Sequence, residues 1–189
     1  VSDDALRDLA RLVRRLHDAA EGWVPPQGAV FGSIPGMLDP PLEPLFDAPE
    51  LVAHQDYCPG NVVFRDGRPV ALIDFDLARL TTRVADLVNL LHWWAPLRSP
   101  VDRAPALADV DVVARVHAAV AAYGLTPEQR AQVVPVAVRR ARNVVRSMRA
   151  AADVDPVFRR WWETGAAEEV VRSRDWVAAE APRLAAALA

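Results

Sequence analysis

Three oxygen-bearing side chains, Asp56, Asn61 and Asp74, have the types and spacing of a site that handles phosphate and a divalent cation. A small set of hard oxygen ligands suits Mg²⁺, which keeps several waters and completes its coordination with substrate phosphates. These residues therefore predict a site for Mg²⁺ bound together with the phosphates of a substrate.

A short hairpin is expected to bring the three side chains together. Asp56 and Asn61 lie on a turn-rich stretch directly before the apolar run 62–64, and Asp74 directly follows the apolar run 70–73. Between the runs stands the dipeptide Asp-Gly, a strong turn signal for two antiparallel strands. Because a tight hairpin returns its second strand beside its first, both carboxylates and the amide should converge at its open end.

The order His54-x-Asp56-x-x-x-x-Asn61, followed by an aspartate after a hairpin, is that of the catalytic loop of kinases. A competing interpretation takes Asp74-Phe75-Asp76 as the metal motif of a glycosyltransferase. We disfavour it, because such enzymes need an α/β sugar-nucleotide domain and this chain shows no alternation of strands and helices.

The segment 51–94 resembles the core of the aminoglycoside phosphotransferase family, kinase-like enzymes that phosphorylate small molecules. The helix around residues 10–17 resembles the one that this family places before its catalytic loop, and residues 123–128 and 161–162 resemble the helical tail of bacterial members. The resemblance implies an α+β, mainly helical fold: the C-terminal lobe of the protein-kinase-like fold, with a small β-hairpin carrying the catalytic loop. Residues 1–189 would form this single lobe, and the N-terminal nucleotide lobe is expected to be absent.

By this resemblance Asp56 is the catalytic residue, which orients the substrate hydroxyl and accepts its proton. Asn61 and Asp74 would hold Mg²⁺ against the phosphates of ATP or GTP, so they are both metal ligands and cofactor-binding residues. The expected partners are a nucleotide, a small molecule with a hydroxyl group, and a missing N-terminal lobe or partner chain. Without that lobe the chain alone is expected to be poorly active.

Three further residues receive supporting roles from the resemblance. His54 would brace the catalytic loop through hydrogen bonds, and Asp86 would open a helix and support the loop from behind. Asp76 could join the metal site or cap the following turn, and both options stay open. The family usually has glycine at the position of Gln55, where this sequence departs from the pattern.

The alternative function is a non-catalytic binding or immunity module built on the isolated lobe. The missing nucleotide lobe favours it, whereas the retention of Asp56, Asn61 and Asp74 argues against it, since a binder needs none of the three.

Composition excludes several other classes of protein. All 22 positively charged residues are arginine, so these residues contain no P-loop lysine and no Schiff-base lysine. The net charge of −3 gives no support for a nucleic-acid partner, and no apolar run is long enough for a membrane span. A single cysteine, Cys58, fits a reducing compartment, and we expect a cytoplasmic protein.

The remaining elements are predicted from periodicity and breakers. Apolar residues at helical spacing predict a helix over 3–20, with Ser2 as its N-cap. Seven prolines between Trp23 and Pro49 predict a long irregular segment that covers or serves a site. Further helices are expected over 84–94, 104–123, about 126–152, 154–164 and 166–188. We expect the arginines of the fourth of these six helices, Arg139, Arg142, Arg146 and Arg149, to form a solvated face.

Overall fold

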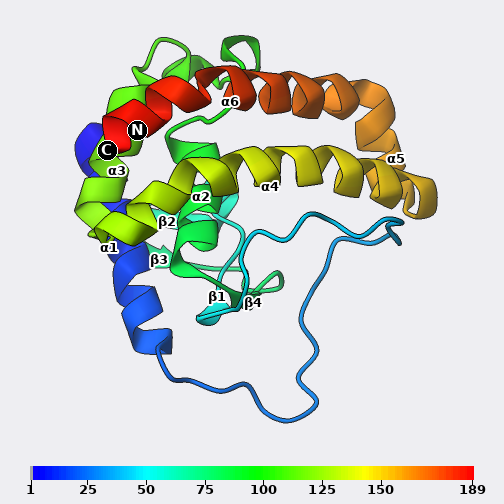
Figure 1. The fold of residues 1–189 in the computed structure, drawn as a ribbon, viewed down its shortest axis with the longest axis horizontal. Helices are drawn as coiled ribbons and strands as arrows, with labels where there is room; N and C mark the ends of the chain where they lie inside the picture. Colours follow the sequence, from blue (N-terminus) through cyan, green and yellow to red (C-terminus); the bar gives the residue numbers. More distant parts are fainter. Residues whose placement is uncertain (1) are drawn as a thin grey trace.

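The computed structural model describes residues 2–189, which form a mainly helical α+β protein with two small antiparallel ladders (Figure 1). Short 3₁₀ turns lie at Pro59–Asn61, Pro100–Asp102 and Pro105–Leu107, and a π-type turn at Trp162–Ala166. The helices and strands are α1 (Asp3–Ala20), β1 (Leu51–Ala53), β2 (Val62–Arg65), β3 (Arg68–Leu72), β4 (Arg79–Thr81), α2 (Arg83–Trp94), α3 (Val112–Tyr123), α4 (Pro127–Val154), α5 (Pro156–Trp161) and α6 (Ala167–Leu188). Among these residues no helix is both long and apolar enough to cross a membrane.

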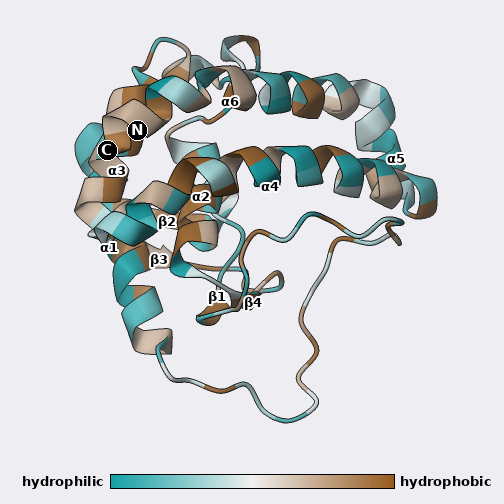
Figure 2. Cartoon of the chain, in the orientation of Figure 1, coloured by the Kyte–Doolittle hydropathy of each residue, from teal (hydrophilic) through white to brown (hydrophobic). Residues whose placement is uncertain are grey.

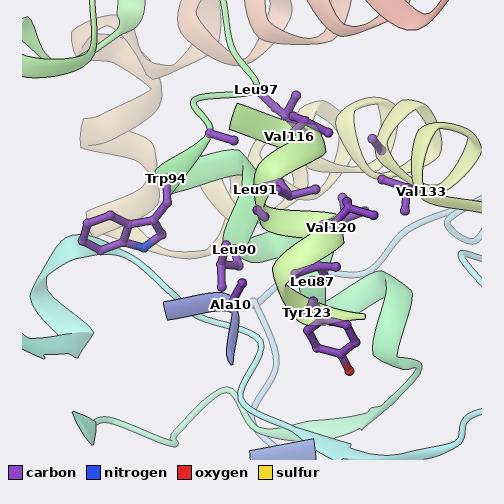
Figure 3. Packing of buried hydrophobic residues seen from close by; sticks show 14 of the residues in the cluster. Ala10, Leu87, Leu90, Leu91, Trp94, Leu97, Val116, Val120, Tyr123 and Val133 are labelled. Carbon is purple, nitrogen blue, oxygen red and sulfur yellow. The ribbon is translucent and has the colours of Figure 1, made fainter. Parts of the chain in front are cut away.

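Helix α2 lies at the centre of the hydrophobic core. Nine of its twelve residues are buried: seven are apolar and account for the brown parts of the helix in Figure 2, and two, Asp86 and Asn89, are polar and lie on one face. The buried faces of α1, α3 and the first half of α4 pack around it, and Figure 3 shows Leu87, Leu91, Val120 and Val133 meeting there. A helix enclosed in this way is held rigidly, which suits it to position a loop.

The predicted helix over 3–20 is confirmed, and its cap is too, since the hydroxyl of Ser2 accepts a hydrogen bond from the amide of Ala5. The fourth predicted helix is confirmed as α4, where Thr126 and Gln129 form a capping box. The prediction over 104–123 is wrong at its start. Pro100 and Pro105 confine residues 100–107 to single 3₁₀ turns, so α3 begins only at Val112.

The hairpin is confirmed as β2 and β3, with Val62 opposite Leu72. Asp66 and Gly67 at its tip both have positive φ, 51° and 75°, as a tight primed turn requires. A second ladder, β1 with β4, was not predicted because three-residue strands carry almost no periodicity. Strand β1 precedes the segment that holds the predicted site, and strand β4 follows it.

Residues 23–50, called here the strap, first loop away from the helices and then lie against α4 between residues 36 and 45 (Figure 1). Arg139 donates to the carbonyl of Leu45, Asn143 bonds both backbone groups of Glu43, and Arg146 donates to the carbonyls of Pro40 and Pro41. The prediction of a solvated face is therefore wrong for Arg139 and Arg146, whereas Arg142 and Arg149 are exposed as predicted. Prolines leave the strap without a hydrogen-bond ladder of its own, and the α4 side chains supply donors to its carbonyls instead.

Two glycines of the strap are required by close approach. A Cβ at Gly32 would overlap the carbonyl oxygen of Asp76, and one at Gly36 would lie 2.7 Å from the carbonyl oxygen of Ala150. The strap is thus fixed at one point to the loop after Asp74 and at another to α4.

We predict that Gly36→Ala destabilises the protein more than Gly28→Ala does. Both glycines have positive φ, 107° and 82°, so both variants carry backbone strain, about 1–2 kcal/mol for an L-residue in the left-handed region. Only Gly36 faces neighbouring backbone, since nothing lies within 4 Å of a Cβ at Gly28. Gly36→Ala should therefore lose about 1–3 kcal/mol more unfolding free energy than Gly28→Ala, because of overpacking. Urea unfolding of both variants measures this difference. Equal losses would show that the strap is not packed on α4.

Candidate active site

The side chains of Asp56 and Asn61 are hydrogen-bonded to each other. The amide nitrogen Nδ2 of Asn61 donates to Oδ2 of Asp56 at 2.8 Å and also to its backbone carbonyl at 3.2 Å. The other carboxylate oxygen, Oδ1, accepts the backbone N–H of Cys58 at 3.2 Å. The carboxylate is therefore held in one orientation by two donors, while the carbonyl oxygen Oδ1 of Asn61 has no partner among residues 2–189.

Asp74 is brought to the same end of the hairpin by a backbone hydrogen bond. The N–H of Ile73 donates to the carbonyl of Asn61 at 3.0 Å, and Asp74 is the next residue. Asp74 has φ 63°, a left-handed conformation that aspartate tolerates better than most residues, and it is exposed. Within the described chain its carboxylate makes no hydrogen bond or ion pair.

Asp76 is exposed two residues further on, and its carboxylate caps no turn within the described chain. The turn that follows is closed by the backbone alone, since the amide of Ala78 donates to the carbonyl of Phe75 at 2.9 Å. Of the two options for Asp76, the role in a metal site stays a prediction.

His54 is fully buried and joins the two halves of the site. Its Nδ1 accepts the backbone N–H of Asp56 at 3.2 Å, so Nε2 carries the proton and donates to the carbonyl of Ile73 at 2.9 Å. Its ring also lies 4.4 Å from that of Phe75, centroid to centroid. With both nitrogens used by backbone groups, His54 ties the residue before Asp74 to the loop of Asp56.

Behind the loop, the buried carboxylate of Asp86 in α2 receives four hydrogen bonds. Its Oδ1 accepts the backbone N–H of Gln55 at 2.9 Å and the side-chain amide of Gln55 at 2.7 Å. Its Oδ2 accepts Nε2–H of His17 at 2.7 Å and the hydroxyl of Tyr57. Nδ1 of His17 lies 2.6 Å from the hydroxyl of Tyr123, so the network joins α1, α2, α3 and the loop.

Electrostatics favour the ionised form of Asp86 although it is completely buried. Burial alone would raise its pKa, but the hydrogen bonds from His17, Tyr57 and Gln55 outweigh that effect and lower the pKa below its usual value. Burial and the nearby Asp86 charge raise the pKa of Tyr57 well above its usual value, and burial raises that of Tyr123 to about 12. Both phenols therefore stay protonated and available as donors.

Two more residues of α2 bind the same loop. Asn89 accepts the N–H of Tyr57 at 3.3 Å and donates to the carbonyl of Gln55 at 2.8 Å, and Trp94 donates to the carbonyl of Tyr57 at 2.7 Å. Gln55 itself has φ 64°, which explains why glycine suits this position. Here the side-chain amide bonded to Asp86 offsets part of that strain.

The free oxygens of Asn61 and Asp74 suit a magnesium ion that is bound together with phosphates. Asn61 offers a carbonyl oxygen and Asp74 a carboxylate, and no cluster of three acidic, histidine or cysteine ligands exists among residues 2–189. A cage made only of protein ligands is thus missing from this part of the chain. Mg²⁺ needs just one or two protein oxygens when phosphates and waters supply the rest.

Cys58 lies in the loop but is not activated. Burial and the neighbouring Asp56 carboxylate raise the pKa of its thiol above the usual value, so the unreactive thiol form dominates at neutral pH.

Sequence reasoning missed the residues that complete the network: His17, Tyr57, Asn89 and Tyr123. Asn89 could have been found, since it follows Asp86 by three residues on the same helical face. Nothing local marks His17 or Tyr123, because their hydrogen bond spans more than a hundred residues of sequence.

We predict that Asp86→Asn lowers the free energy of unfolding by about 3–5 kcal/mol, because an asparagine cannot accept from all four donors. The folded pKa of Asp86 is lowered, so its stabilisation is complete above the unfolded value of about 4 and is lost as pH falls through the folded pKa. The variant should therefore lose this part of the acid sensitivity between about pH 5 and pH 2. Chemical denaturation over that range measures it.

Asp4→Asn is the matched control, since Asp4 is exposed and pairs only with Arg7 on its own helix. It should change stability by no more than about 0.5 kcal/mol. A similar small effect for Asp86→Asn would show that the network does not hold the loop.

Comparison with known proteins finds a family match over the part of the chain that contains the candidate site. The sequence profile of the phosphotransferase enzyme family matches residues 33–123, just under half of the chain. A trifolitoxin immunity protein of Rhizobium leguminosarum bv. trifolii is 27% identical over 198 aligned residues, covering all of this chain and 70% of that protein. No solved structure matches significantly. The resemblance to the phosphotransferase enzyme family is thus confirmed over residues 33–123, which contain every residue predicted for the site.

Proposed function

We propose that this protein is a phosphotransferase that moves the γ-phosphoryl group of ATP or GTP to a hydroxyl of a small molecule. One observation carries the proposal. The Asp56 carboxylate is fixed by Asn61, while the remaining oxygen of Asn61 and the carboxylate of Asp74 are unengaged at the same end of the hairpin. In this proposal a base and two metal-binding oxygens thus lie at the same end of the hairpin.

Asp56 has the role of orienting the acceptor hydroxyl and taking its proton as the hydroxyl oxygen attacks the γ-phosphorus. The new oxygen–phosphorus bond forms while the bond to the β-bridging oxygen breaks, and the nucleoside diphosphate leaves. Asn61 and Asp74 would hold Mg²⁺, which neutralises charge on the transferring phosphates. His54 and Asp86 act only through the backbone that carries these residues.

In this proposal the fold is the C-terminal lobe of a kinase-like enzyme, and a nucleotide-binding lobe or partner chain packs beside the hairpin. Its support is the exposure of large apolar side chains next to the site, Ile73, Phe75 and Leu80, each 43–49% exposed. Such a group of exposed apolar residues is typical of an interaction surface. In this proposal the isolated 189 residues turn over poorly, and the protein acts in the cytoplasm, where ATP and GTP are available.

We predict that Asp56→Asn lowers the turnover rate of the complete protein by about 10²-fold or more, while the affinity for Mg²⁺–nucleotide changes little. Asp74→Asn should also weaken the metal-dependent binding, because it removes a ligand oxygen. Nucleotide consumption over a panel of hydroxyl compounds measures turnover, and calorimetry with and without Mg²⁺ measures binding.

Asp66→Asn is the control, since Asp66 lies at the far tip of the same hairpin and asparagine keeps its φ of 51°. In NMR spectra of the 189-residue chain, paramagnetic Mn²⁺ should broaden the backbone amide signals of positions 61 and 74 in the wild type and in Asp66→Asn. It should leave both signals sharp in Asp74→Asn. Full turnover by Asp56→Asn would refute the proposal.

A second candidate is a binding module that confers immunity without catalysis. It is favoured by the relative whose alignment covers the whole chain, because that relative is named a trifolitoxin immunity protein. The two functions differ in one measurement: a binding module would protect cells equally well with Asp56→Asn, whereas a phosphotransferase would not.

A further inference from the structure

A cavity of about 60 Å³ lies between α2, α4 and α6. Its walls are mostly apolar, and the polar groups that line it are few: His92, Arg140, Glu169, Ser173 and Arg174. The volume is roughly that of two water molecules, which is enough for one small oxyanion group. A pocket of this kind, apolar with a few polar groups, is typical of sites that orient a small ligand.

The charges around the cavity are paired except for one. Glu169 accepts Nη1–H of Arg98 at 3.0 Å, and Arg174 donates to Asp175 at 2.8 Å. Arg140 makes no hydrogen bond or ion pair with any residue of the described chain. The guanidinium of Arg140 is partly buried and still reaches solvent, so an anionic group that enters the cavity can replace water and pair with it.

The surroundings of Arg140 contain further positive charge. Burial, together with Arg79 and Arg98, lowers its pKa to about 10, while Asp56 and Asp86 act in the opposite direction. Arg140 is therefore still charged at neutral pH. Arg79 does not relieve the excess, since its hydrogen bond is to the side-chain oxygen of Gln55 at 3.4 Å rather than to an acid.

His92 adds no counter-charge and no further cation. Burial and the nearby Arg140 and Arg98 lower its pKa well below the usual value, so it is neutral, and its Nε2 accepts from Arg98 at 2.9 Å. Among the described residues that line the cavity, Arg140 is thus the cation without a hydrogen-bond partner, and the Asp56 carboxylate is among the charges that act on it.

We propose that Arg140 binds an anionic group of the acceptor, a carboxylate or a phosphate monoester, and so selects a small anionic hydroxyl compound as substrate. This inference rests on the proposed phosphotransferase function. The acceptor fits better than the nucleotide, because the cavity is enclosed by helices, whereas the metal-binding oxygens lie on the hairpin. A polycationic acceptor would meet repulsion from Arg140, Arg79 and Arg98.

The test measures anion binding by the 189-residue chain without nucleotide or metal. The probes are D-glycerate and glycerol 3-phosphate, with glycerol as the uncharged match, and the readout is the side-chain Nε–H signal of Arg140 in ¹⁵N spectra. Both anions should shift this signal and glycerol should not. Arg140→Gln should weaken binding by at least about tenfold, the effect of losing a charge-assisted hydrogen bond.

Arg130→Gln is the matched control, with the same charge change in the first turn of α4 and no effect expected on binding. Arg140→Gln should also unfold at no lower temperature than the wild type, because it removes an unpaired charge. Equal weakening by both variants, or a shift with glycerol, would overturn the proposal.

Turnover separates this inference from the proposed function. If the complete protein phosphorylates only uncharged or cationic acceptors, and Arg140→Gln does so equally well, the enzyme stands and the anionic acceptor is refuted. If the anions bind at Arg140 but no compound is phosphorylated, the anion site stands and the proposed function fails. Phosphorylation of anionic acceptors with a KM raised in Arg140→Gln supports both.

Discussion

The buried carboxylate of Asp86 is the constraint on which the site depends. A lone ionised acid in a protein interior is strongly unfavourable, and this one is retained because His17, Tyr57 and Gln55 donate to it. Those donors come from separate parts of the chain, so satisfying the charge fixes α1, α2 and the loop that carries Asp56 relative to one another. This arrangement also positions Asp56, because Asp56 lies in the same loop.

Polar groups that find no partner within their own segment also characterise the strap and the cavity. The groups of the strap find partners on α4, whereas the cation at the cavity finds none in the described chain. The carbonyls of the strap have no ladder of their own, and Arg139 and Arg146 provide their donors. Arg140 lies between these two on α4 but turns to the cavity and finds no acceptor in the described chain. One helix thus presents arginines that bind the strap and an arginine that faces a cavity.

Much of the site could be predicted from local sequence. The Asp-Gly turn fixed the hairpin, and the hairpin placed Asn61 and Asp74 at one end, because antiparallel pairing leaves little freedom once the turn is known. Prediction failed where the cause lay elsewhere in the chain. The second ladder pairs strands too short to show a period, and two arginines of the stripe on α4, Arg139 and Arg146, are engaged by the distant strap rather than by solvent alone.

The amino-acid sequence by itself determined the chemistry available: an oxygen-rich loop, a hairpin and amphipathic helices, all set by residues near one another in the chain. Only the tertiary structure decided which groups are satisfied. It paired His17 with Asp86 and Tyr123, and it left Arg140 without a partner among residues 2–189. The physical reason is that hydrogen bonding and burial depend on distances between segments, which periodicity and turn signals do not contain.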